Sequence, residues 1–135
     1  MTPEQFINDR CRALQRQDYA AVYASYHPQA QFLCNFSGRA DYLTFAAEQL
    51  TAIELLDWSC TRQRTLPNGD VECLLIMELQ VDGELQPFYE LALLKPFDGE
   101  WRYHSAQKLN NADYPGDPQQ LDFKHFDLAA EKIRF

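Results

Sequence analysis

The spacing of apolar residues changes once along this 135-residue chain, and that change constrains the fold more than any other feature. Before Ile53, apolar side chains recur every three or four residues, as in Ile7, Cys11 and Leu14, with Arg10 expected on the exposed side. This spacing predicts amphipathic helices. From Ile53 onward apolar and polar residues alternate, which predicts half-buried strands. Helices followed by an antiparallel meander predict a single α+β domain.

Capping and turn residues divide the chain into elements. Thr2-Pro3-Glu4-Gln5 is a capping box that begins a first helix, and Asp18 caps a second helix that Pro28 ends. A short extended piece from Gln31 to Phe36 precedes a third helix, which Ser37-Gly38 opens. Turn-forming residues such as Asp-Gly separate the four expected strands, which are 53–66, 71–81, 85–95 and 100–109.

The last segment, 110–135, follows the domain formed by residues 1–109. Its first part, 110–120, contains two prolines and a glycine and predicts a surface loop. A short helix is expected from Phe126 to Ile133. Because the segment is too apolar for a free tail, we expect it to pack on this domain or on a neighbouring subunit.

Apolar residues on both sides of the second strand suggest an assembly. Leu74 and Ile76 lie on the face opposite Cys73, Leu75 and Met77, so one face packs on the helices and the other needs cover. We therefore predict a homodimer that buries Leu74 and Ile76, since a symmetric dimer is the commonest closed assembly. The alternative is that the C-terminal segment covers this face within one chain.

Charge and composition exclude several classes of partner and cofactor. The formal net charge of -8 at pH 7 disfavours nucleic acid and anionic membranes. No apolar run approaches the roughly 20 residues that cross a bilayer, and the first residues lack the features of a signal peptide. The four cysteines and three histidines have no close ligand spacing. The sequence therefore predicts no metal or other cofactor, and a cytoplasmic protein with reduced thiols.

Two regions of the sequence resemble a known superfamily. Gln17–Tyr23 running into His27–Phe32, and Tyr89–Leu91 running into Phe97–Tyr103 with its Gly-x-Trp, are similar to the nuclear transport factor 2-like superfamily. This superfamily includes ketosteroid isomerase and the SnoaL-like proteins. The resemblance spans roughly residues 3 to 109 and is nearest to the middle domain of YchJ-type bacterial proteins, without their cysteine-rich SEC-C segments.

This resemblance implies a cone-shaped fold whose helices and curved sheet enclose a pocket. We expect binding of a small, largely apolar molecule without strong catalysis, in a pocket above about 300 Å³. Aromatic residues either line such a pocket or fill the core. The candidates are Tyr23, Tyr26, Trp58, Tyr89, Trp101 and Tyr103.

Charged residues within apolar strands are the candidates for catalysis. Asp57 and Glu90 either face outward or point inward as an acid or base beside a pocket tyrosine, in an isomerase or dehydratase. His104 follows Tyr103, so only one of these two can face the pocket. In ketosteroid isomerase the base follows the first short strand, which corresponds to Leu33-Cys34-Asn35, where no carboxylate is present. A third possibility is a ligand-free dimeric interaction module with an apolar patch on the outer sheet.

Overall fold

The computed structural model describes residues 1–127 and confirms the α+β class, with helices first and an antiparallel sheet after them. The sheet is a meander in which each strand pairs with the next along the chain. The strands are β1 (Ile53–Thr65), β2 (Val71–Val81), β3 (Glu84–Phe97) and β4 (Glu100–Asn110). The helices are α1 (Pro3–Gln15), α2 (Tyr19–Ala24), η1 (Gln31–Asn35), α3 (Arg39–Gln49), η2 (Pro118–Gln120) and α4 (Phe123–Asp127).

The predicted helix starts are confirmed by side-chain caps. The Thr2 hydroxyl accepts a hydrogen bond from the Gln5 backbone, and the Gln5 side chain accepts one from the Thr2 backbone. The Asp18 carboxylate accepts from the Ala21 backbone in the same way. Each bond satisfies a backbone N–H that the first helical turn leaves free.

Helix α2 ends at Ala24, earlier than Pro28, because the following residues attach to the edge of the sheet. The Tyr103 N–H donates to the Ser25 carbonyl oxygen, and the His27 N–H donates to the Tyr103 carbonyl oxygen, both at 2.8 Å. This short parallel bridge brings Tyr26 beside Tyr103 on β4. The bridge therefore positions the end of α2 against the sheet.

The expected extended piece from Gln31 to Phe36 is wrong, because residues 31–35 form the 3₁₀ helix η1. Its backbone bonds are local, from Leu33 N–H to the Ala30 oxygen and from Phe36 N–H to the Leu33 oxygen. The Phe32 ring stacks on Tyr26 at a centroid distance of 5.9 Å. Contacts with the helices therefore replace pairing with a strand.

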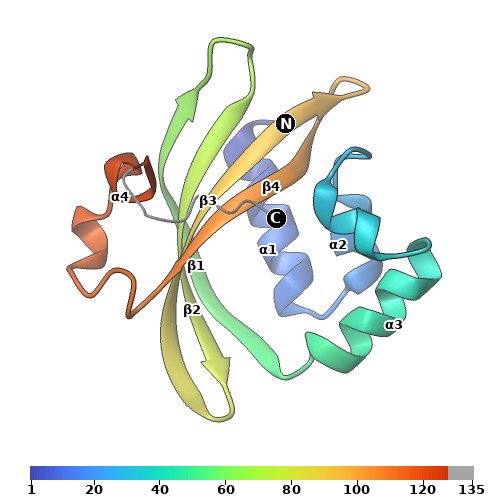
Figure 1. Ribbon diagram of the computed structural model, residues 1–135, viewed down its shortest axis with the longest axis horizontal. Coiled ribbons are helices and arrows are strands. Elements are labelled where there is room, and N and C mark those ends of the chain that lie inside the picture. The colour runs from blue at the N-terminus through green and yellow to red at the C-terminus, as the bar shows by residue number, and fades with distance from the viewer. Residues whose placement is uncertain (128–135) are drawn as a thin grey trace.

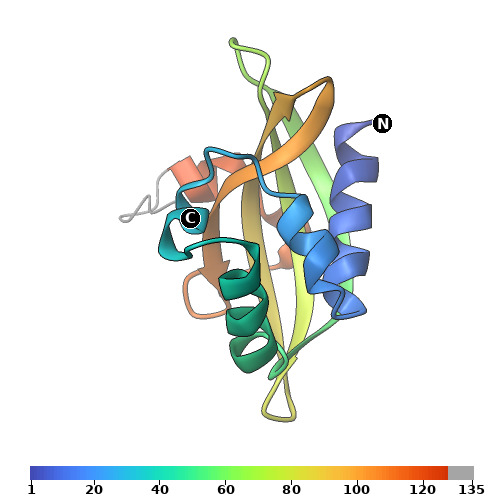
Figure 2. The ribbon, with the colours of Figure 1, turned by 90° about the vertical axis from the view of Figure 1, so that its right-hand side faces the viewer.

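The structure has three layers, with the sheet between helices α1–α3 and residues 111–127 (Figure 1). Figure 2 looks onto the helical side and shows α1, α2 and α3 lying over one face of the sheet. On that face Cys73, Leu75 and Met77 of β2 pack with Phe6 and Ile7 of α1. The alternation of β2 thus places its odd-numbered residues under the helices.

Residues 111–127, which we call the C-terminal cover, pack on the opposite face of the sheet (Figure 1). Leu121 and Phe126 of the cover form a buried cluster with Leu74, Tyr89 and Leu91. Leu74 is fully buried without a second chain. The exposed apolar face that motivated the homodimer is therefore occupied by the chain itself.

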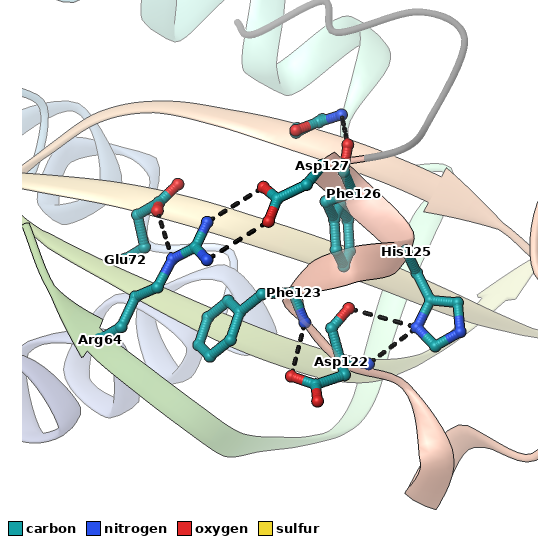
Figure 3. A network of polar contacts seen from close by, with 8 residues as sticks. Arg64, Glu72, Asp122, Phe123, His125, Phe126 and Asp127 are labelled. Atoms are coloured by element: carbon teal, nitrogen blue, oxygen red, sulfur yellow. Dashed lines mark hydrogen bonds and ion pairs between the residues drawn. The ribbon is translucent and has the colours of Figure 1, made fainter.

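Polar contacts attach the C-terminal cover to the sheet (Figure 3). The Arg64 guanidinium pairs with Glu72 at 2.8 Å and with Asp127 at 3.1 Å, and it lies over the Phe123 ring. The Gln107 side chain donates to the Phe126 carbonyl oxygen at 2.8 Å. Since the Glu72 side chain is only 2% exposed, its pairing with Arg64 compensates a buried charge.

The helix expected from Phe126 to Ile133 is described only in its first part. Helix α4 begins at Phe123, three residues earlier than expected, and continues to Asp127. Residues 128–133 of the expected helix lie outside the described residues.

Candidate functional site

A cavity of about 200 Å³ lies between the helices and the inner face of the sheet. It is smaller than the 300 Å³ that we expected for a ligand pocket. Side chains from α1, α2, η1, α3 and all four strands surround it, and most of them are apolar. These apolar residues are Leu14, Val22, Phe32, Phe45, Leu50, Ile53, Leu55, Met77, Leu79 and Phe88.

A few polar side chains also reach this cavity, which we call the inner cavity. In chain order they are Arg10 of α1, Tyr19 of α2, Tyr26 after α2, Tyr42 of α3, Glu90 of β3, and Tyr103 and Lys108 of β4. Glu90 and Lys108 are directly opposite each other in the β3–β4 register. A mostly apolar cavity with a few convergent polar groups is typical of small-molecule sites.

Glu90 and Tyr103 form the centre of this polar group. Glu90 is 6% exposed and Tyr103 is 2% exposed, and the Tyr103 hydroxyl interacts with the Glu90 carboxylate. Burial raises the pKa of Tyr103 well above its ordinary value, and the negative charge of Glu90 raises it further. Tyr103 is therefore a neutral donor at physiological pH.

Arg10 packs its guanidinium against both aromatic neighbours. Its Cζ lies 3.7 Å from the Tyr103 ring centroid and 5.1 Å from that of Tyr26, and its Nε donates to the Ser25 hydroxyl at 3.1 Å. Burial alone would lower the pKa of Arg10, but Tyr26, Tyr103 and Glu90 outweigh this and raise it. The guanidinium therefore stays charged within the structure.

The expected exposed position of Arg10 is wrong, because the residue is only 9% exposed. The sequence held a signal for this, since Phe6, Arg10 and Leu14 are four residues apart and share one helix face. The charge of Arg10 predicts an exposed position, whereas its ring contacts with Tyr103 and Tyr26 allow it to be buried.

Tyr42 lies in the wall of the inner cavity and carries an unsatisfied hydroxyl. The side chain is fully buried, and its hydroxyl has no hydrogen-bond partner among residues 1–127. Tyr26 lies beside it, with ring centroids 6.0 Å apart. Burial, with a smaller contribution from Tyr26, raises the pKa of Tyr42 and keeps the hydroxyl protonated. A buried donor without a partner is rare in folded proteins.

Only two of the six predicted aromatic residues, Tyr26 and Tyr103, line the inner cavity. Tyr23 instead packs on Tyr42 at a centroid distance of 5.2 Å and is absent from the cavity lining. Tyr89 faces the other side of the sheet, where it meets Tyr114 at 5.5 Å. The alternation of β3 explains this, because Tyr89 precedes the inward-facing Glu90.

The two tryptophans also lie away from the inner cavity. Trp58 is half-buried in the core, where its Nε1 donates to the Asn8 side-chain oxygen at 3.1 Å. Trp101 lines a second hollow of about 430 Å³, between α1, α2 and the β3–β4 turn. Arg10 lines both hollows.

The three catalytic candidates are not brought together. Asp57 is exposed on β1, and its carboxylate accepts a hydrogen bond from the Trp58 backbone. His104 lies beside His27, with ring centroids 5.7 Å apart, and is absent from the lining of the inner cavity. Glu90 alone faces the cavity, beside Tyr103.

The described residues 1–127 contain no group of three or more histidine, cysteine or acidic residues placed to hold a metal ion. No helix within that range is long and apolar enough to cross a membrane. No protein-family model matches the sequence, and no curated protein matches it.

The buried acids predict a loss of stability in alkali. Burial raises the pKa of Cys11 from its ordinary 9.0 to about 12, and the pKa of Tyr103 also lies above its ordinary value. Above pH 9 the unfolded thiol releases its proton while the folded thiol retains it. The free energy of unfolding is therefore expected to fall by about 1.4 kcal/mol per pH unit for each such group.

Urea unfolding between pH 8 and about 11 measures this loss. Below pH 9, Cys11 is expected to make no contribution to the change of the free energy of unfolding with pH, because its thiol stays protonated in both the folded and the unfolded state. The Cys11→Ala variant is expected to lose less stability per pH unit than the parent above pH 9. An equal slope for both proteins would contradict the assignment of Cys11.

Proposed function

We propose that this chain is a small-molecule-binding protein of the nuclear transport factor 2-like type, with the inner cavity as its binding site. The cone shape of that superfamily is part of the proposal. Three N-terminal helices on one face of a four-stranded antiparallel meander are compatible with it. Because one fold hosts many functions, the argument for binding rests on the cavity itself.

The volume of the inner cavity limits the size of the ligand. Ligand pockets for drug-sized molecules span roughly 300 to 1,000 Å³. The inner cavity measures about 200 Å³. An apolar cavity of about 150 Å³ is enough to bind benzene. The proposed ligand is therefore a compact molecule with one ring and a small substituent, which excludes polycyclic molecules.

The Tyr42 hydroxyl is the observation that carries the proposal. It is buried in the cavity wall and lacks a hydrogen-bond partner among residues 1–127. A buried polar group without a partner costs about 1 to 3 kcal/mol. A ligand with an acceptor oxygen, such as a carbonyl group, would accept this bond once the side chains around the fully buried hydroxyl shift, while its apolar ring contacts Leu55 and Met77.

Replacing Tyr42 with phenylalanine separates the polar from the apolar part of this recognition. We expect the affinity for cyclohexanone to fall about five- to tenfold in Tyr42→Phe, because one hydrogen bond is lost. The affinity for methylenecyclohexane, which has no acceptor, should not fall. NMR chemical-shift titration with both probes measures the two dissociation constants. The variant without ligand should unfold at a higher temperature, since it lacks the unsatisfied hydroxyl.

Tyr23→Phe is the matched control, because Tyr23 packs on Tyr42 without lining the cavity. It should leave both affinities unchanged. If neither probe shifts the resonances of residues that line the inner cavity, the proposed binding site is wrong. If Tyr42→Phe weakens both probes equally, the cavity binds them without the hydroxyl.

A second candidate function is acid–base catalysis on the bound molecule, of the isomerase or dehydratase type. A buried carboxylate that interacts with a cavity tyrosine favours it, and Glu90 with Tyr103 provides this pair. A general base must reach a proton of the ligand, and Glu90 lies in the cavity wall. The absence of a carboxylate at Leu33-Cys34-Asn35 means that the base would come from β3 instead of the ketosteroid isomerase position.

The interaction module receives less support than either small-molecule function. It required an apolar patch on the outer face of the sheet, and the C-terminal cover fills that face at Leu74 and Leu91. The homodimer loses the same motivation and stays a prediction, as does a cytoplasmic location. Sedimentation at micromolar concentration tests the homodimer directly.

A further inference from the structure

Two cysteines on neighbouring strands share one patch of the inner face of the sheet. Cys73 of β2 and Cys60 of β1 belong to the core cluster on the helical side. In the β1–β2 register Cys60 is opposite Leu75, and Cys73 is opposite Gln63. The two cysteines are therefore diagonal neighbours, next to an irregularity of β1 between Cys60 and Arg62.

The two thiols lie close enough to shift each other's pKa, and the Cys60 thiol donates a hydrogen bond to the Arg62 carbonyl oxygen at 3.7 Å. Interaction with Cys73 lowers the pKa of Cys60, against the opposing effects of burial and of the Glu4 carboxylate. The same interaction, together with burial, raises the pKa of Cys73. The pair is therefore asymmetric, with Cys60 as the more reactive nucleophile.

The two cysteines also differ in access to solvent. Cys60 is partly exposed, whereas Cys73 is completely buried. A small oxidant can reach Cys60 from the solvent side of β1, but it reaches Cys73 only through Cys60. β1 is an outer strand of the sheet, and the irregularity next to Cys60 bends and twists the strand locally.

We propose that Cys60 and Cys73 are a peroxide-responsive pair that closes a reversible disulfide between β1 and β2. The Cys60 thiolate attacks one oxygen of hydrogen peroxide, which breaks the O–O bond and leaves a sulfenic acid and hydroxide. The Cys73 sulfur then attacks the Cys60 sulfur and forms the S–S bond. The S–O bond breaks, and its oxygen leaves as water with the Cys73 proton. In sum, two thiols are oxidised and one peroxide is reduced to two waters.

Mass spectrometry of the folded protein tests this pair. The Cys34→Ser variant serves as the parent, because Cys34 is exposed and would react independently. The protein is treated with hydrogen peroxide, and its free thiols are then blocked under denaturing conditions. We expect two cysteines to remain unmodified by the blocking reagent, and we expect a disulfide-linked peptide that contains residues 60 and 73. Dithiothreitol should reverse the link. The same treatment of the urea-unfolded parent should also give links to Cys11, in proportions that follow the lengths of the loops closed.

Single substitutions distinguish the two roles. Cys73→Ser should leave Cys60 as a sulfenic acid that dimedone traps, without a disulfide. Cys60→Ser should abolish the disulfide and leave Cys73 unoxidised, and Cys60→Ala repeats the test if the first variant does not fold. A native protein that forms no 60–73 link, or that links Cys60 to Cys11 equally well, would overturn the proposal.

Discussion

Replacing Phe126 with alanine is expected to lower the free energy of unfolding by about 3 to 5 kcal/mol, as in other buried phenylalanine truncations. Phe126 is completely buried and packs with Leu74, Leu91 and Leu121 in the cluster beneath the C-terminal cover. Its carbonyl oxygen accepts from Gln107, so the truncation removes packing at a point where the backbone is held (Figure 3). Urea unfolding monitored by tryptophan fluorescence measures the change.

Phe97→Ala is the matched control, because Phe97 is 40% exposed at the end of β3. It should lower the free energy of unfolding by well under half of the decrease expected for Phe126→Ala. The Phe126 variant is also expected to bind a hydrophobic dye or to form dimers, since the outer face of the sheet becomes accessible. If Phe126→Ala unfolds like the wild type, the C-terminal cover does not hold this face.

For the proposed acid–base function, Glu90→Gln is expected to slow catalysis by about 100-fold or more, since a positioned general base contributes 10²- to 10⁴-fold. The reaction to follow is deuterium exchange at the α-carbons of cyclohexanone in D₂O, measured by NMR. Glutamine keeps the size of the side chain but cannot accept a proton from the ligand. The affinity for cyclohexanone should change much less than the exchange rate.

Asp57→Asn is the control for Glu90→Gln, because it neutralises the other candidate carboxylate, which is exposed on β1. Its exchange rate should equal that of the wild type. Tyr103→Phe should give an intermediate rate, because it removes the hydroxyl that interacts with Glu90 without removing the carboxylate. A wild-type protein that binds cyclohexanone but exchanges its protons no faster than buffer would exclude acid–base catalysis and leave the binding proposal intact.

The sequence by itself determined the elements and their order, except for the extended piece expected where η1 forms. The Thr2 and Asp18 caps are local interactions within one helical turn, and the Asp82-Gly83 and Asp98-Gly99 turns need two successive residues at positive φ, which glycine favours and aspartate tolerates. The alternation of β2 likewise fixed which of its residues share a face. Local geometry of this kind does not depend on the rest of the fold, so the four strands and three helices could be predicted.

The tertiary structure decided which residues form the candidate site. Adjacent strand positions face opposite sides, so the choice between Tyr89 and Glu90 as the inward residue depended on register, which no local pattern fixes. Arg10 and Tyr42 were missed because burial of a charge or a hydroxyl depends on neighbours from other elements, here Tyr103 and the inner cavity.

The same reason applies to the outer face of the sheet. The sequence showed that Leu74 needs cover and that residues 110–135 are apolar enough to provide it. It could not distinguish cover within the chain from cover by a second copy, because both bury the same apolar area. The structure shows that the chain's own residues cover this face. The ion pairs of Arg64 and the hydrogen bond from Gln107 to Phe126 hold the C-terminal cover over β2 and β3.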